Sequence, residues 1–244
     1  MNFPTRIPTR HALAAAMSTA VLFGGAAFAT PTYTLISSGS LNGSTYEVWM
    51  RDSVLTWSEA SNYANNTLKE RLVSINSVAE NDFVASLIGD PRLYTNAWPG
   101  GPTSEYLGPY IGLKRNGPTT GVVNPNVGWQ WVDGTSLTQS DPLWNLWFNV
   151  GNPGGQPDAM HGDNVALYYN TTASNVTTWG DVYDGATFLP QYGGGPNMFL
   201  ANSFVIEKVP GPVPLMAAFA AFRWSRQLRR RHNRADGVSL ASLH

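Results

Sequence analysis

The chain has 244 residues, with 15 Lys and Arg against 16 Asp and Glu and no cysteine. The lack of cysteine excludes disulfides, thiol nucleophiles and cysteine-ligated zinc, so core packing or a hard metal ion must stabilise the fold. Between residues 30 and 209, seven basic residues stand against fifteen acidic ones, a formal charge of −8, and no Lys or Arg occurs from 116 to 207. Such a surface repels phosphate backbones and attracts cations, which makes nucleic acid a poor partner.

Residues 1–29 have the pattern of a secretory signal peptide. Arg6 and Arg10 precede an apolar run from Ala12, which closes with small residues at Ala27 and Ala29. This pattern predicts export and cleavage after Ala29. An uncleaved membrane anchor is the alternative, and the small and polar residues within the run disfavour it.

Residues 30–209 are long enough for one domain with a sizeable core. The alternation from Tyr33 to Arg51, with Asn42-Gly43 in the middle, predicts a β-hairpin. Two helices should follow, each opened by a capping box, with a short strand from Leu72 to Ile75 between them. The capping pairs are Thr56 with Glu59 and Ser77 with Glu80.

The rest of this domain is rich in Gly, Pro and Asn, with short apolar islands that predict strands. The islands are Tyr110–Leu113, Trp129–Val132, Val165–Tyr169 and Phe204–Ile206. Strands and helices in this order indicate an α+β fold.

Three short polar segments offer oxygen ligands to a hard cation. They are Gln156-Pro157-Asp158, Asp163-Asn164 and Trp179-Gly180-Asp181. A calcium ion takes about six to eight oxygens from carboxylates, amides and backbone carbonyls, and these segments contain all three. The alternative interpretation is that Gln-Pro-Asp is an ordinary turn and that the aspartates are solvated.

The C-terminal residues 210–231 combine a Pro-rich hinge, a short apolar stretch and an arginine cluster, followed by a tail at 232–244. This arrangement resembles the PEP-CTERM sorting signal of bacteria that make exopolysaccharide. The resemblance implies processing at the cell envelope and transient membrane contact, although Gly211 stands where the usual motif has Glu. A disordered basic tail is the alternative. About a dozen helical residues are too short for a stable membrane span.

Six motifs between Tyr33 and Lys208 occur in the order found in the C-type lectin-like domain, which this region resembles. They are Thr56–Ala60, Leu72–Ile75, Ser77–Asn81, Tyr110–Leu113, Trp129–Gly134 and Trp179–Asp181. The resemblance implies a small twisted antiparallel sheet, two flanking helices and a long loop region that carries ligands.

In sugar-binding members of that family, residues matching Gln156, Asp158, Asp163 and Asp181 hold one Ca²⁺, and two sugar hydroxyls complete its shell. The Gln-Pro-Asp triplet is associated there with galactose-type hydroxyl geometry. Two departures predict a weakened site: Gly180 replaces an Asn ligand, and Asp163 is shorter than the usual Glu. Asn164 or water is a candidate for the vacant position.

The remaining conspicuous side chains receive structural interpretations. Trp129, Trp131 and Trp179 are expected in the core. Tyr168 and Tyr169 alternate on a strand, so one should point inward and the other toward the ligand side. Asp184 is expected in a turn and His161 in a loop.

The sequence therefore predicts an exported carbohydrate-binding protein that uses Ca²⁺ and associates with extracellular polysaccharide or the cell envelope. The alternative is a matrix or adhesion module that uses the same fold for contacts with envelope proteins. A glycosidase with paired carboxylates is a third hypothesis. Only the number of carboxylates supports it, so we expect no enzymatic activity.

Overall fold

The computed structural model describes residues 30–97, 105–117, 124–152, 155–158, 164–171, 176–185 and 199–208. The expected signal peptide, the C-terminal segments 210–231 and 232–244, His161 and Asp163 lie outside these ranges. The described helices and strands lie within the unit Pro31–His244. Within the described ranges, none of the helices has the length and apolar character that crossing a membrane requires.

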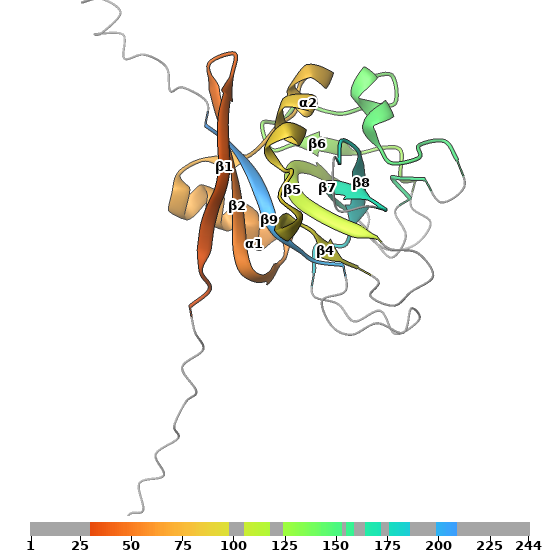
Figure 1. Ribbon diagram of the computed structural model, residues 1–244. Helices are drawn as coiled ribbons and strands as arrows, with labels where there is room; N and C mark the ends of the chain where they lie inside the picture. Colours follow the sequence, from red (N-terminus) through yellow and green to blue (C-terminus); the bar gives the residue numbers. More distant parts are fainter. Residues whose placement is uncertain are drawn as a thin grey trace, which may run out of the picture. The chain divides into compact units, whose positions relative to one another are not determined.

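A mixed sheet forms the centre of this unit (Figure 1). Its main path runs β1-β2-β9-β5-β7-β8, with β3 beside β9 and with β4 and β6 beside β5. The pairs are antiparallel except for β5 with β9, which is parallel. The strands are β1 (Tyr33–Leu41), β2 (Ser44–Leu55), β3 (Arg71–Leu72), β4 (Thr95–Asn96), β5 (Tyr106–Arg115), β6 (Trp129–Trp131), β7 (Val165–Asn170), β8 (Trp179–Val182) and β9 (Ala201–Lys208).

The first hairpin and the first helix follow their local sequence signals. The turn between β1 and β2 places Asn42 at φ 52° and Gly43 at φ 91°. Positive φ at both residues is the geometry that Asn-Gly favours between twisted strands. Helix α1 (Trp57–Tyr63) begins after Thr56, and the predicted capping box with Glu59 is complete. A π-helical turn, η1 (Ala64–Leu68), continues it.

The second capping box forms only in part. Helix α2 (Val78–Leu87) begins after Ser77, whose side chain accepts from the Glu80 N–H. The Glu80 carboxylate instead accepts from the Tyr46 hydroxyl at 2.7 Å and from the Asn76 N–H at 2.8 Å. The local pattern assigned the Glu80 carboxylate to the start of α2, but the buried Tyr46 hydroxyl on β2 binds it instead.

The strand predicted from Leu72 to Ile75 is shorter in the structure, because β3 covers only Arg71–Leu72. Val73 nevertheless donates its N–H to Val205 and accepts from Gly112, both backbone groups. The two short 3₁₀ helices that follow along the chain, η2 (Pro91–Leu93) and η3 (Pro142–Leu146), were not predicted.

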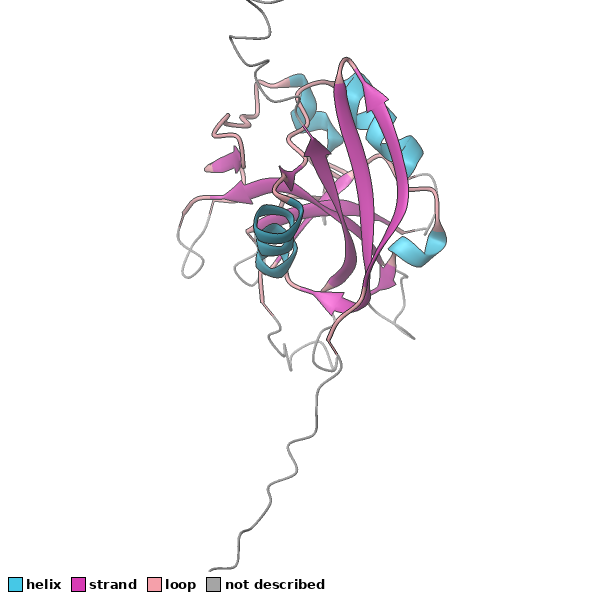
Figure 2. Cartoon of the chain, turned by 90° about the vertical axis from the view of Figure 1, so that its left-hand side faces the viewer, coloured by secondary structure: helices cyan, strands magenta, loops and turns pink. Residues whose placement is uncertain are grey.

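Hydrophobic clusters lie on both faces of the sheet, and each receives one helix. Neighbouring residues of a strand point to opposite faces, so Val205 joins the cluster with α2, while Phe204 and Ile206 join the cluster with α1. Burial on both faces explains why the central strands are continuous apolar runs. The helices lie on both sides of the strands (Figure 2). The observed α+β architecture confirms the predicted fold class.

One buried amide connects α2 to the strands that carry the candidate site. Asn81 is fully buried, and its Oδ1 accepts from the Tyr168 hydroxyl and from the Trp179 indole N–H, each at 3.0 Å. Its Nδ2 donates to the Thr177 carbonyl at 2.9 Å. Asn81 therefore fixes both β7 and β8 against the helix.

Candidate functional site

Three of the four predicted ligands lie together at β8. Gln156 Nε2 donates to Asp158 Oδ2 at 3.3 Å, and the Asp158 backbone N–H donates to Asp181 Oδ1 at 3.1 Å. The Asp181 backbone N–H donates to Gln156 Oε1 at 3.0 Å. The three residues thus form a closed ring of hydrogen bonds. The Gln156–Pro157 peptide bond between them is cis. Asp163, the fourth predicted ligand, lies outside the described residues.

Backbone hydrogen bonds hold this ring against the end of the sheet. Phe148 donates its N–H to the Trp179 carbonyl, and Gln156 donates its N–H to the Phe148 carbonyl, both at 2.8 Å. Asp181 stands opposite Ala166 in the pairing of β8 with β7 and is only 5% exposed. Residues that are far apart in sequence are thus joined through the main chain at the end of the sheet.

Gly180 has a specific steric role in this site. A Cβ at position 180 would lie 2.7 Å from both Cβ and Cγ of Tyr169. The Tyr169 ring also packs edge-on against Phe148, with ring centroids 5.1 Å apart. The Asn ligand expected from the resemblance is therefore replaced by space for the Tyr169 ring, which explains why a glycine interrupts the triplet.

Tyr169 and Glu105, a residue that no sequence motif marks, form a second part of the site. The two side chains are near enough to each other, and to the charge of Asp158, for each to act on the pKa of the other. Burial is the main cause that raises the pKa of Glu105; the Tyr169 hydroxyl opposes it and Asp158 reinforces it. Burial and the neighbouring Glu105 charge raise the pKa of the Tyr169 phenol. Glu105 and Tyr169 thus lie near Asp158 of the hydrogen-bonded ring.

Strand alternation was the sequence signal for Tyr169. Tyr168 is fully buried and Tyr169 is partly exposed near Asp158, as the alternation predicted. Glu105 precedes the acidic stretch that begins after Arg115, and no motif marks it.

Two other residues have local partners. The Asn164 side-chain oxygen accepts from the Asp184 backbone N–H at 3.2 Å. The Asp184 carboxylate accepts from the backbone N–H and the hydroxyl of Ser58 at the start of α1. Asp184, expected as a simple turn residue, thus joins the loop after β8 to α1. The three tryptophans expected in the core, Trp129, Trp131 and Trp179, are each at most 4% exposed, which confirms that prediction.

The donors fit a calcium ion in chemical type, because one amide and two carboxylates are hard oxygen ligands. In the structure, however, Gln156 Oε1 and Asp181 Oδ1 accept backbone N–H groups, and the Gln156 amide nitrogen faces Asp158. A cation would have to displace that amide contact. Among the described residues there is no group of three or more His, Cys, Asp or Glu side chains arranged to hold a metal.

Comparison with known proteins gave structural matches only. Two solved structures of human lithostathine are similar to 70% of this chain, at 20% and 22% sequence identity, each with a TM-score of 0.41. The similarity covers 87% and 95% of those chains, respectively. No family model matches the sequence. No curated protein matches it either.

Proposed function

We propose that this protein is a C-type lectin-like module that binds carbohydrate with the help of Ca²⁺. The observation that carries the proposal is the hydrogen-bonded ring of Gln156, Asp158 and Asp181. It joins one amide and two carboxylate residues by hydrogen bonds in the loop region, and these three residues match ligand positions in the family that the sequence resembles. Asp163 is the proposed fourth ligand.

Each partner in the ring has a distinct role in this proposal. The Phe148 and Trp179 backbone groups hold the loop in register with β8 before any ligand arrives. Carboxylates accept hydrogen bonds strongly and suit the donating hydroxyls of a sugar. A bound Ca²⁺ would supply positive charge to attract the hydroxyl oxygens of the same sugar. The acidity of residues 30–209, at −8, favours capture of the cation.

The site should bind the ion weakly. Gly180 contributes no amide, and the Gln156 contact with Asp158 competes with the cation for the same carboxylate. A partly exposed glutamate, Glu105, adds negative charge beside Asp158 and offsets some of this loss.

Calorimetry with Ca²⁺, combined with a glycan array with and without EGTA, tests the proposal. Asp158→Asn keeps the size of the side chain and removes its charge, so it should abolish both Ca²⁺ binding and the EGTA-sensitive glycan signals. Asp82→Asn is the matched control, since Asp82 is an exposed aspartate on α2. Glycan binding that EGTA leaves unchanged would reject the calcium mechanism.

A second function is favoured by the completeness of the ring. Because the amide and carboxylate groups already satisfy one another and nearby backbone groups, the loop could serve as a rigid latch in a matrix or adhesion module that binds envelope proteins. In that case Asp158→Asn would leave partner binding unchanged in the presence of Ca²⁺.

Export to the cell envelope or the extracellular space is part of the proposal. It is supported by the sequence patterns of residues 1–29 and 210–231. Fractionation of cells that express the full chain, followed by mass spectrometry of both termini, should find a mature N-terminus at Thr30 in the exported form. An intact N-terminus on cytoplasmic protein alone would contradict it.

A further inference from the structure

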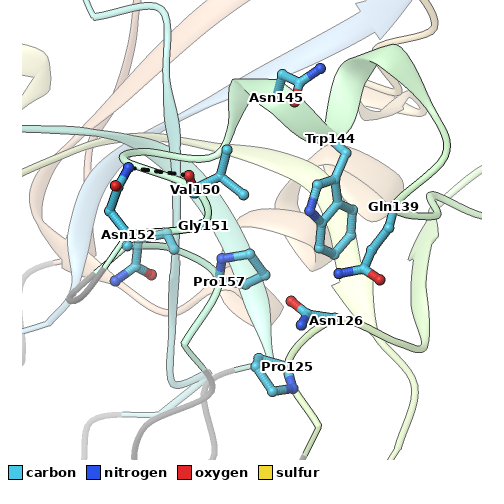
Figure 3. A pocket seen from close by; sticks show the side chains of 11 residues that line it. Pro125, Asn126, Gln139, Trp144, Asn145, Val150, Gly151, Asn152 and Pro157 are labelled. Atoms are coloured by element: carbon cyan, nitrogen blue, oxygen red, sulfur yellow. Dashed lines mark hydrogen bonds between the residues drawn. The ribbon is translucent and has the colours of Figure 1, made fainter.

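A cavity of about 490 Å³ lies beside the loop that carries Gln156 and Pro157 (Figure 3). Ligand pockets commonly measure about 300–1,000 Å³, so the cavity has the size of a small-molecule site. Nine of its eleven lining residues have no part in the predicted calcium site. The lining residues are Pro125, Asn126, Gln139, Trp144, Asn145, Val150, Gly151, Asn152, Gly155, Gln156 and Pro157.

The polar part of the lining consists of side-chain amides, and no lining residue carries a charge. An amide offers donors and acceptors together, which matches a hydroxyl group that both donates and accepts. A charged ligand would lose hydration here and find no opposite charge in the lining. The chemistry thus favours a neutral ligand rich in hydroxyl groups. The amides come from Asn126, Gln139, Asn145, Asn152 and Gln156.

The apolar part of the lining suits the C–H surface of a sugar ring. Pro125, Val150 and Pro157 provide aliphatic contact, and Trp144 adds the edge of its indole. Trp144 is only 5% exposed and packs against Trp147, so its ring face is not available for stacking. Its nitrogen edge faces the space beside Val150 and Pro157 (Figure 3). The indole N–H on this edge is one further donor for a hydroxyl oxygen.

We propose that this cavity, which we term the amide pocket, is a second site that binds a short neutral saccharide without a metal ion. The inference goes beyond the proposed function, because it requires neither Ca²⁺ nor Asp158. Gln156 belongs to both places: its amide contacts Asp158 and Asp181, and the residue also lines the amide pocket. Adjacent sites that share a residue suit neighbouring units of one polysaccharide chain better than two separate ligands.

Saturation-transfer NMR and calorimetry on the full chain in EGTA, with cellobiose, lactose and maltose as probes, test this inference. Gln139→Ala removes an exposed amide from the lining, and Asn126→Asp introduces a charge with almost no change in volume. Each should weaken binding of a responding disaccharide by about tenfold or more, which is the loss of roughly one good hydrogen bond. Asn66→Ala and Asn66→Asp are the matched controls at an exposed amide on η1, outside the pocket lining. Unchanged melting temperatures show that each variant folds.

The outcomes separate the two sites. Binding in EGTA that Gln139→Ala and Asn126→Asp weaken, and that the Asn66 controls leave intact, supports the amide pocket even if no calcium-dependent binding exists. Binding that EGTA abolishes entirely overturns the amide pocket and leaves the calcium proposal standing. A complete lack of disaccharide binding in EGTA, or binding that both pocket variants leave unchanged, overturns it as well. So does a preference for uncharged peptides over every saccharide tested.

Discussion

Two regions of the sheet, β2 with β9 and the edge strand β8, hold their acidic residues in different ways. On the side of β2 and β9, Glu47 lies 2.5 Å from the Lys208 ammonium, and Glu207 lies 3.9 Å from the Arg71 guanidinium. At β8, the side-chain oxygens of Asp181 and Gln156 accept neutral backbone N–H groups. A cation cancels the charge of the carboxylate that it holds, whereas a backbone N–H positions a carboxylate and leaves its charge in place. Basic side chains thus accompany the acids at β2 and β9, whereas backbone groups position the acids at β8.

The largest expected effect concerns Asn81, whose amide holds β7 and β8 against α2. Asn81→Leu keeps the approximate volume and deprives the Tyr168 hydroxyl, the Trp179 N–H and the Thr177 carbonyl of their partner. The Tyr168 hydroxyl and the Trp179 N–H are buried, and leaving them unsatisfied should lower the free energy of unfolding by about 3–5 kcal/mol. Urea denaturation measures this loss, and Asn66→Leu on η1 is the exposed control. A loss no larger than that of the control would show that β8 holds its place without Asn81.

A smaller loss is expected where Gly180 meets Tyr169. Gly180→Asn restores the residue type that the family resemblance calls for, but its Cβ would lie 2.7 Å from the tyrosine side chain. We expect a destabilisation of about 1–3 kcal/mol and no gain in Ca²⁺ affinity, because overpacking distorts β8.

The double variant Gly180→Asn with Tyr169→Ala tests the cause. Removing the ring should relieve the clash, so the double variant should be more stable than the sum of the two single effects predicts. Strictly additive losses, measured by thermal or urea unfolding of all four proteins, would show that the conflict lies elsewhere.

On β9, Lys208→Met should lower the free energy of unfolding only modestly. The Lys208 side chain is 39% exposed, and an ion pair of this kind contributes about 0.2–1 kcal/mol at low salt. Most of this difference between wild type and variant should disappear in 1 M NaCl, because salt screens the pair. A loss that high salt does not reduce would indicate that the aliphatic stem, and not the charge, stabilises β9.

The smallest effect is a pH dependence at Glu105. Its pKa lies above the ordinary 4.5, chiefly because of burial, so the folded protein keeps this proton at pH values where the unfolded chain has lost it. Stability should therefore fall as the pH rises from 4.5 through the raised pKa. Glu105→Gln removes this contribution, so its stability relative to wild type should increase over that window and then stay constant. Urea titrations between pH 4 and pH 8 compare the two proteins, and a difference that decreases with pH would contradict the assignment.

The sequence predicted best the features that depend on neighbouring residues. Asn42-Gly43 and the Thr56 cap act within a few residues, and both formed as expected. Glu80 failed as a helix cap because Tyr46, on another strand, binds its carboxylate. No local pattern encodes a partner that is brought near only by folding.

In the candidate site, too, the sequence predicted the residues that belong to motifs and missed those that depend on tertiary contacts. Gln156, Asp158 and Asp181 were predicted from motif positions, and the structure brings them together. Strand alternation placed one of Tyr168 and Tyr169 on the ligand side, whereas Glu105 was not assigned to the site, since its proximity to Tyr169 is tertiary. The steric reason for Gly180 was equally invisible, because it depends on a ring from the neighbouring strand.

The Asn81 hydrogen bonds also have a kinetic consequence. They join residues 87 to 98 positions apart in the chain, so each requires a large loop to close first. Contacts of such long range form slowly, because chain entropy opposes them until the surrounding core is in place. The hairpin and α1 depend on short-range contacts and can form early. We therefore expect β8, and the polar ring that it carries, to gain protection from hydrogen exchange last during refolding.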